Sequence, residues 1–170
     1  MGLKMDFGRL LANNSCDRFF IMHLSYNGKN NLKLWDYAVK NSLIGLDVPG
    51  IVTDNWSVIR ARAMRQLGRG WTRQFDYFCD TIGKGDFIMV FNGMSEVLGI
   101  ARTKVANHRY DRSLSQSKEF FDHIRDVEWI RKNDFNHPAK LEKPLYGFSN
   151  TLSIVPNSSP RWQILTQLEI

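Results

Sequence analysis

The chain has 170 residues, of which 43% are hydrophobic and 24% are charged, and its net charge is +6 at pH 7. This hydrophobic content is enough for one core and too high for a disordered chain, and the length suits a single domain. The apolar runs are far shorter than the roughly 18 residues of a membrane-spanning helix, and the N-terminus lacks the apolar stretch of a signal peptide. We therefore expect a cytoplasmic protein with a leader over residues 1–17 and a single domain over residues 18–170.

The first part of the chain predicts a strand and then a helix. Residues 18–26, "RFFIMHLSY", are rich in aromatic and aliphatic side chains and carry no charge after the first position, which is typical of a buried strand. Residues 31–45, "NLKLWDYAVKNSLIG", predict a helix for which Asn30 or Asn31 is the candidate N-cap and which Gly45 ends.

Residues 56–82 predict two more helices, separated by the "GRG" of residues 68–70. The first has an apolar stripe at positions i, i+3, i+7 and i+11, formed by Trp56, Ile59, Ala63 and Leu67. The second has a predicted buried face formed by Phe75, Phe78, Cys79 and Ile82.

The second half of the chain predicts mostly strands. Residues 83–105, "GKGDFIMVFNGMSEVLGIARTKV", contain two apolar runs around a tight turn and predict a β-hairpin. Residues 122–132, "DHIRDVEWIRK", and residues 151–156, "TLSIVP", predict further strands. A helix over residues 158–168 closes the chain, with Pro160 in its first turn. This order of elements is typical of an α+β domain with a small, barrel-like sheet.

Positive charge is concentrated in residues 60–73, "RARAMRQLGRGWTR", which hold five arginines and no acidic residue. A solvated helix face is the simplest explanation of such a run. Arginine, however, binds phosphate oxygens through two parallel hydrogen bonds, so an all-arginine run favours contact with a polyanion. The predicted phosphate-binding residues are Arg60, Arg62, Arg65, Arg69 and Arg73, together with Lys104 and Arg109.

Motifs for catalysis are missing from the sequence. The four histidines have no HExxH spacing and the two cysteines are isolated, so we expect neither a metal site nor a disulfide. There is no GxSxG motif, and "GKGD" lacks the second half of a P-loop. Asp122, Asp126 and Glu128 lie close in sequence, but we do not expect them to form a catalytic pair. The sequence therefore predicts no enzyme activity and no cofactor; a small nuclease with scattered acids is the alternative.

Three segments, taken together in their order, resemble the PUA-like superfamily, specifically its YTH and EVE branches. They are "FFIMHLSYNGKNNLKLWDYAVKNSLIGLD", "MVFNGMSEVLGIARTKV" and "FFDHIRDVEWI", and the resemblance covers residues 18–168. The "GKGD" lead-in and the arginine-rich helical segment are similar to prokaryotic members, which include the N-terminal DNA-binding domain of McrB-type restriction GTPases. The resemblance implies an α+β fold with a small PUA-like β-barrel surrounded by helices.

The same resemblance implies a pocket that takes a methylated base between aromatic side chains. Leu46 stands where the family has its first aromatic, and Phe120 and Phe121 are candidates for the later ones; in an extended segment one of these two rings would point inward and the other outward. Asn31 or Asn30 matches the position whose side chain contacts the base edge. The expected pocket residues are Leu24, Ser25, Tyr26, Asn30, Asn31, Trp35, Leu46, Asp47, Phe91, Tyr110, Phe120 and Phe121.

The resemblance, together with the arginine-rich segment, implies a nucleic-acid-binding module that recognises N6-methyladenine or 5-methylcytosine in DNA by flipping the base into an aromatic pocket. It would be the targeting module of a modification-dependent restriction system, with a GTPase domain in the same full-length chain and a nuclease subunit as partners. Two alternatives stay open: an RNA reader of N6-methyladenosine with the same fold, and a protein-assembly module that uses the basic face as an interface. A steep salt dependence of affinity would separate nucleic-acid binding from protein docking.

Overall fold

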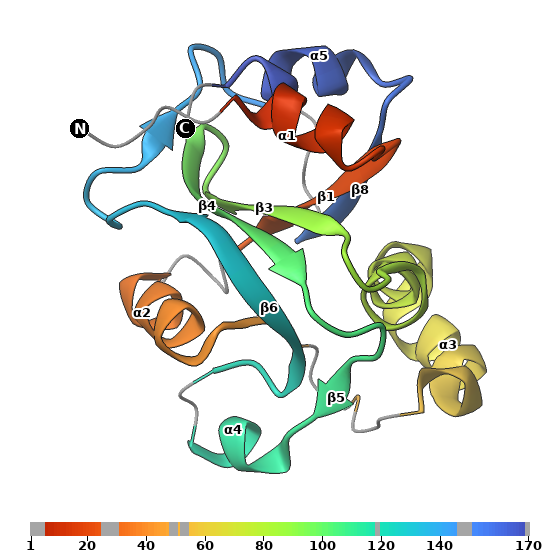
Figure 1. Cartoon of the computed structure of the whole chain (residues 1–170). Helices are drawn as coiled ribbons and strands as arrows, with labels where there is room; N and C mark the ends of the chain where they lie inside the picture. The colour runs from red at the N-terminus through yellow and green to blue at the C-terminus, as the bar shows by residue number, and fades with distance from the viewer. Residues whose placement is uncertain are drawn as a thin grey trace.

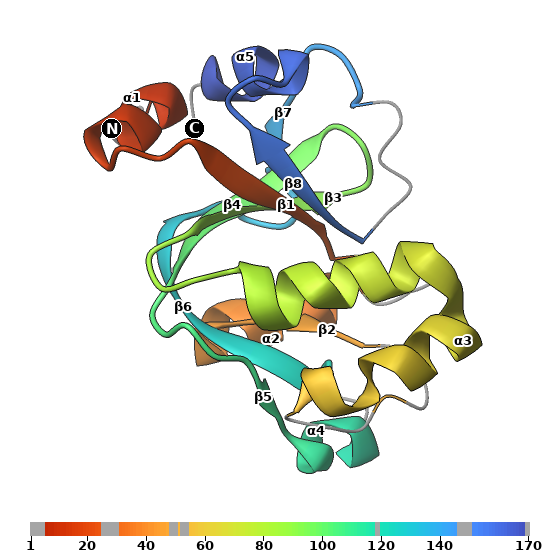
Figure 2. The same cartoon turned by 90° about the vertical axis from the view of Figure 1, so that its right-hand side faces the viewer.

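The computed structural model describes residues 6–24, 31–47, 51, 55–117, 120–145 and 151–168. In this part of the chain the fold is mixed α+β, with one curled sheet, shaped like half a barrel, between two groups of helices (Figure 1). Helices α1 (Phe7–Asn13) and α5 (Pro160–Thr166) lie on one side of the sheet, and α2 (Asn31–Asn41) and α3 (Trp56–Phe75) lie on the other (Figure 2). The α+β class expected from the sequence is confirmed.

The sheet has eight strands, of which six form the path β2-β6-β4-β3-β1-β8, while β5 pairs with β6 and β7 with β4. Strands β1 and β3 run parallel, and the other pairs are antiparallel. The strand bounds are β1 (Arg18–His23), β2 (Leu43–Leu46), β3 (Phe87–Asn92), β4 (Glu96–Thr103), β5 (Arg109–Tyr110), β6 (His123–Lys132), β7 (Ala139–Lys140) and β8 (Leu152–Pro156). Two further helical segments are the π-helical η1 (Asp76–Thr81), which continues α3, and α4 (Arg112–Ser117).

Alternate side chains of the central strands enter two separate hydrophobic cores. In β1, Phe20 and Met22 lie in the core shared with α2 and α3, whereas Phe19 and Ile21 lie in the core shared with α1 and α5. All four side chains are at most 1% exposed. Because both faces of the central strands are buried, these strands have nearly continuous apolar sequences. Among the described helices, none is long and apolar enough to cross a membrane.

Helix α1 is part of the domain, which corrects the expectation that residues 1–17 form a leader. Phe7 and Leu11 are fully buried in the second core, and the Phe7 ring meets Phe19 edge-on at 5.1 Å. The Asp6 side chain caps the helix by accepting a hydrogen bond from a backbone N–H of the first turn. Two apolar residues spaced at i and i+4 thus dock this short helix against the sheet, beside α5.

Most elements predicted from the sequence are present. The hairpin predicted over residues 83–105 is formed by β3 and β4, and the later strands are β6 and β8. Helix α5 begins at Pro160 after Ser159, whose hydroxyl accepts a hydrogen bond from Arg161 N at 3.2 Å. Most of the apolar positions predicted for the helices are also buried: Phe75 and Phe78 are fully inaccessible, whereas Ile59 and Leu67 are only partly buried.

Strand β2 differs from the prediction, which placed residues 43–45 at the end of a helix. Ser42 has φ 55°, a left-handed conformation that ends α2 and redirects the chain. Residues 43–46 then pair antiparallel with β6. The short elements β5, β7 and α4 were not predicted either.

Helix α3 is bent back on itself at Gly68, where φ 76° and ψ 177° are not helical angles. Trp56 at the start of α3 stacks on Phe75 at its end with ring centroids 5.0 Å apart, whereas a straight helix would separate these residues by about 28 Å. The Asp76 carboxylate closes the bend by accepting hydrogen bonds from Trp56 Nε1 at 2.8 Å and from Arg60 Nε at 2.6 Å. The break predicted at the two glycines is confirmed, and its two arms lie side by side in Figure 2.

Replacing Gly68 by alanine is expected to lower the free energy of unfolding by about 1–3 kcal/mol, because L side chains rarely adopt this backbone conformation. A Cβ at Gly68 would meet no atom within 4 Å, so the backbone alone produces the effect. Gly70→Ala is the matched control, since its Cβ would also lie in open space but its φ is not positive. Urea denaturation measures both variants, and equal losses of stability would contradict a bend that depends on Gly68.

Candidate nucleic-acid interface

Four arginines of α3 form an exposed cationic surface, called here the α3 arginine face. Its members are Arg62, Arg65, Arg69 and Arg73, and all four are exposed. Helix α3 contains no acidic residue. Within the described ranges, no ion pair joins any of these four side chains to an acid. Guanidinium groups without an internal partner keep their N–H donors for an external anion.

Arg60 differs from these four arginines because its guanidinium has a partner inside the protein; its role as a phosphate ligand stays a prediction. Its guanidinium makes two hydrogen bonds to the Asp76 carboxylate, at 2.6 and 2.7 Å. The hydrogen bond from Arg60 lowers the pKa of Asp76 below its ordinary value. Arg60 thus closes the bend in α3, because it joins one arm of the helix to the end of the other.

The Arg60–Asp76 pair makes stability depend on pH. Because the pKa of Asp76 is lowered in the folded state, its contribution is present above the unfolded-state pKa of about 3.9 and is lost as the pH falls through the folded-state value. We expect Asp76→Asn to lower the free energy of unfolding at pH 6, and the difference from the wild type to vanish towards pH 2. Urea denaturation across this range measures the difference. Asp80→Asn, which changes an exposed acid in η1, is the control, and an equal effect of both variants would contradict the assignment.

Lys104 and Arg109, which we expected to extend the cationic surface, lie near the loop between β4 and β5. Lys104 is exposed. Arg109 lies 3.4 Å from an Asp111 oxygen and 3.5 Å from an Asp126 oxygen. Because these ion pairs are long and largely exposed, they contribute little and do not prevent Arg109 from contacting an anion.

Aromatic rings gather where β6 begins. Phe120 stacks on Tyr37 of α2, with centroids 4.9 Å apart and an interplanar angle of 20°, and meets Phe121 edge-on at 5.0 Å. Tyr110 of β5 lies 5.2 Å from the His123 ring. We call Tyr37, Tyr110, Phe120, Phe121 and His123 the β6 aromatic cluster. The sequence predicted three of its members but neither Tyr37 nor His123.

Phe120 and Phe121 both point into the protein, which corrects the expectation of one inward and one outward ring. They are 6% and 7% exposed. Both residues precede β6 and are not part of a strand, so they need not point apart. Their rings pack against Gly45 of β2: a Cβ there would lie 2.6 Å from Phe121 Cβ and 2.9 Å from Phe120 Cε1. A glycine at this position therefore makes room for both rings.

Packed rings connect this cluster with helix α3. Leu46 of β2 pairs with His123 of β6, which pairs on its other side with Tyr110 of β5. The His123 ring meets Phe75 edge-on at 5.2 Å, and Phe75 stacks on Trp56. The bent helix that carries the α3 arginine face is thus packed directly against the β6 aromatic cluster.

Asp47 and Asp122 lie opposite each other, one position beyond the Leu46–His123 pair of β2 and β6. Their side chains are hydrogen-bonded to each other, which requires a proton between them because a carboxylate cannot donate. Burial raises the pKa of Asp122 above its ordinary value, and the hydrogen bond with Asp47 opposes this rise. Asp122 is 6% exposed, and its Oδ1 has no hydrogen-bond partner among the described residues. We call these two residues the carboxyl pair.

The family model of a domain of unknown function, DUF8426, matches residues 22–145 of the chain. The chain belongs to the DUF8426 family. No curated protein and no solved structure matches it significantly. The matched DUF8426 region contains the α3 arginine face, the β6 aromatic cluster and the carboxyl pair, whereas α1, β8 and α5 lie outside it.

Trp35 does not join the β6 aromatic cluster of this DUF8426 chain. It packs near the other end of β6, where it meets Trp129 edge-on at 4.9 Å and donates a hydrogen bond to Asn133 O at 3.1 Å. It also lies over Gly99 of β4, where a Cβ would come within 2.8 Å of its ring. Trp35 is 3% exposed, and it borders an open cavity of about 400 Å³ together with Phe135. The structure therefore makes it a core residue beside a separate cavity.

The other predicted pocket residues fall into three groups. Leu24 and Leu46 are buried in the core that contains the cluster. Phe91 lies in the second core, on the opposite face of the sheet, which corrects its placement in the same pocket. Asn31 is the first residue of α2, and its side chain lies outside the described part. The predictions for Ser25, Tyr26 and Asn30 also lie outside the described residues.

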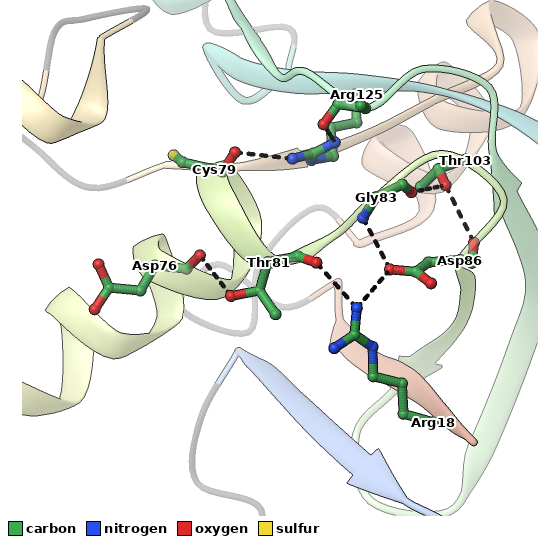
Figure 3. A network of polar contacts seen from close by, with 9 residues as sticks. Arg18, Asp76, Cys79, Thr81, Gly83, Asp86, Thr103 and Arg125 are labelled. Atoms are coloured by element: carbon green, nitrogen blue, oxygen red, sulfur yellow. Dashed lines mark hydrogen bonds and ion pairs between the residues drawn. The ribbon is translucent and has the colours of Figure 1, made fainter. Parts of the chain in front are cut away.

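A polar network ties the end of the bent helix to the sheet (Figure 3). Arg18 of β1 donates to Thr81 O at 3.3 Å and lies 3.6 Å from Asp86 Oδ2. The same oxygen of Asp86 accepts from Gly83 N at 2.8 Å, and the Thr103 hydroxyl of β4 donates to Gly83 O. The "GKGD" segment of this DUF8426 chain thus forms a structural turn in front of the hairpin.

Arg125 of β6 is fully buried, and no ion pair involving it occurs in the described residues. Its guanidinium donates to the carbonyl oxygens of Phe78 at 2.6 Å, Cys79 at 3.1 Å and Ala106 at 2.7 Å. Figure 3 shows the contact with Cys79. Burial lowers the pKa of Arg125 to about 10, so the side chain remains cationic at neutral pH. The sequence did not indicate this role, because an arginine on a strand is usually expected at the surface.

The described residues contain no group of three or more His, Cys, Asp and Glu side chains that could hold a metal ion. Cys16 and Cys79 are free cysteines. Burial raises the pKa of the Cys79 thiol, which suits a residue that packs in the core.

Proposed function

We propose that this DUF8426 chain is a PUA-like reader domain of the YTH or EVE type, which binds nucleic acid and takes a modified base into a pocket at the start of β6. The proposed ligand is DNA that carries N6-methyladenine or 5-methylcytosine. The proposed role is to target a modification-dependent restriction system, in which a GTPase domain of a longer chain and a nuclease subunit perform the catalytic steps.

The observation that carries this proposal is that helix α3, which carries the exposed α3 arginine face, packs through Phe75 against His123 of the β6 aromatic cluster. Phe75 of α3 touches both Trp56, near the arginines, and His123, within the cluster. Sites for single-stranded or flipped bases combine the same two parts, a cationic surface for the backbone and flat rings for the base. Stacking on an aromatic ring contributes about 1–3 kcal/mol per base, which offsets much of the few kcal/mol that unstacking costs.

The aromatic surroundings also favour a methylated base over an unmodified one. A methyl group on an exocyclic nitrogen or on a ring carbon is apolar, and its burial contributes about 0.8 kcal/mol. Aromatic faces contact such a group closely, because their faces carry a partial negative charge and C–H groups a partial positive one. Preference for methylated DNA therefore follows from a pocket lined by rings such as Phe120, Phe121 and Tyr110.

The fold is compatible with this proposal. A curled sheet flanked by helices has the shape of half a small barrel. The segments whose sequences resemble PUA-like proteins correspond to β1 with α2, to the β3–β4 hairpin and to β6. These segments also supply the carboxyl pair and, apart from Tyr110, the rings of the candidate site.

Base unstacking gives a direct test of the proposed function. A fluorescent base analogue, 2-aminopurine, is placed beside a methylated base in a DNA duplex, where stacking quenches its emission. We expect the protein to raise the emission with the methylated duplex and much less with the unmodified one. An RNA strand of the same sequence tests the alternative RNA reader, and absence of binding to every probe at low salt would overturn the proposal in favour of a protein-assembly module.

A further inference from the structure

The carboxyl pair is unusual because it places two like charges opposite each other. Leu46 of β2 pairs with His123 of β6. Asp47 directly follows Leu46 in the chain, and Asp122 directly precedes His123. Like charges in such positions destabilise a sheet, and two adjacent carboxylates are tolerated only when they share a proton. An asparagine at either position would make the same hydrogen bond without this cost. The stability of the sheet therefore does not explain why two acids stand at these positions.

One carboxyl oxygen of the pair, Asp122 Oδ1, accepts no hydrogen bond in the described structure. The backbone carbonyl of Asp122 accepts a hydrogen bond from Asp111 N at 2.8 Å, and the side chain interacts with Asp47 and with the backbone N–H groups of Asp122 and His123. The remaining oxygen, Asp122 Oδ1, is buried and has no partner in the described part of the chain. Buried acceptors in native proteins are nearly always satisfied, so such an atom points to a donor that arrives with a ligand.

The surroundings of Asp122 determine which kind of ligand fits. Its neighbours in the chain, Phe121 and His123, belong to the β6 aromatic cluster. Asp47 and Tyr110 are only partly buried, so this side of the pair is the one nearest to solvent. The position therefore suits a flat, largely apolar ring with a hydrogen-bond donor on its edge.

We propose that Asp122 Oδ1 accepts a hydrogen bond from the exocyclic amino group of the bound base, so that the site takes an adenine-type or cytosine-type base. This inference rests on the proposed function. Adenine and cytosine carry N–H donors on N6 and N4, where a keto base carries a carbonyl oxygen. A keto oxygen facing Oδ1 would bring two acceptors together and leave both unsatisfied. N6-methyladenine and 5-methylcytosine each retain at least one of these N–H donors.

Two matched pairs of probes test this inference without changing the methyl group. The first pair is 5-methylcytosine and thymine, which both carry the C5 methyl and differ in the amino group of one and the keto group of the other. The second pair is N6-methyladenine and 6-methoxypurine, in which an ether oxygen replaces the N–H. Each base is placed in the same DNA single strand, and affinity is measured by fluorescence anisotropy. We expect the wild type to bind the N–H-bearing member of at least one pair tenfold or more tightly.

Two variants separate a recognition role from a structural one. Asp122→Leu keeps the approximate size of the side chain and removes both acceptor oxygens, and we expect the preference to fall below threefold. Asp47→Asn supplies a permanent donor to Asp122 and leaves Oδ1 an acceptor, so it is expected to keep the preference. Thermal unfolding of both variants shows whether a lost preference is accompanied by lost stability, and Asp47→Asn is expected to be at least as stable as the wild type, because its amide makes the hydrogen bond without a shared proton.

The outcomes distinguish this inference from the proposed function. Equal binding of the wild type to both members of each pair, with clear binding overall, would overturn the role of Asp122 and leave the proposed function standing. A preference that persists unchanged in Asp122→Leu would also overturn it. Absence of binding to all four probes, and to unmodified DNA, would instead reject the proposed function itself. The comparison of the wild-type probes holds by itself if Asp122→Leu does not fold.

Discussion

Replacing the α3 arginine face by glutamine is expected to weaken DNA binding by at least about 100-fold at 0.1 M salt, because each lost phosphate contact removes the release of a counterion. The variant changes Arg62, Arg65, Arg69 and Arg73, which are exposed and have no ion pair among the described residues. The slope of log K against log salt should become less steep by about 3.6, since each contact on a duplex contributes about 0.9. Fluorescence anisotropy at several salt concentrations measures both quantities.

A second variant with the same total charge controls for net charge. This control replaces four exposed lysines by glutamine at positions outside α3, on α2, β6 and the loop after β7. The four residues are Lys33, Lys40, Lys132 and Lys143. We expect this variant to change the slope by less than about 1, since it leaves the contacts of the α3 arginine face intact. Equal losses in both variants would show that only the net charge matters, and would contradict a defined phosphate-binding surface.

The second large effect is expected on stability, at Arg125. Replacing Arg125 by methionine should lower the free energy of unfolding by about 3 kcal/mol, because two buried carbonyl oxygens and one partly buried one lose their donor. These carbonyls belong to η1 and to the loop after β4, so the junction between the bent helix and the sheet is lost with them. Arg125→Lys should recover only part of the loss, since an ammonium group lacks the planar fork that reaches all three oxygens.

Arg131→Met is the matched control on the same strand. Arg131 is only partly buried and makes a single side-chain hydrogen bond, at 3.3 Å to Asn133 Oδ1. We expect a loss within about 0.5 kcal/mol, which is usual for substitutions outside such buried networks. Urea denaturation gives both values, and a neutral Arg125→Met would mean that the burial of this charge costs as much as its hydrogen bonds contribute.

Local patterns predicted the secondary structure where the decisive residues are neighbours in sequence. The β3–β4 hairpin follows from two apolar runs around a turn, and α5 follows from Ser159 and Pro160 at its start. Strand β2 could not be predicted in this way. Residues 43–46 become a strand only because β6, far later in the chain, offers hydrogen-bond partners. Tertiary pairing of this kind overrides local propensity.

The bend of α3 could be predicted only in part from the sequence. The glycines at positions 68 and 70 predicted a break, but not that the two arms fold back on each other. That geometry depends on Trp56 meeting Phe75 and on Asp76 binding Arg60. All five arginines of the run are exposed, yet only Arg60 forms an ion pair within the described residues, and the sequence does not distinguish it from the other four.

The structure brings together only some of the residues predicted for the pocket, because their positions depend on contacts between distant parts of the chain. Phe120 and Phe121 were expected in one pocket with Leu46; both lie beside its neighbour Gly45, and their common direction depends on the space above that glycine. Phe91 was placed with them because the sequence does not say which face of β3 the site occupies, and strand alternation puts it on the other face. The carboxyl pair was not predicted, since Asp47 and Asp122 become neighbours only through the register of β2 with β6.

The central claim is that this chain reads a modified base, and its most direct test is the affinity for methylated and unmodified versions of one DNA strand at fixed salt. The strand carries a single N6-methyladenine or 5-methylcytosine, or no modification, in duplex and single-stranded form. We predict at least a tenfold preference, about 1.4 kcal/mol, for one methylated strand, and loss of that preference when Gly45→Ala displaces the Phe120 and Phe121 rings. Equal, salt-sensitive binding to every strand would contradict the account, and would leave a basic surface that binds nucleic acid without reading a base.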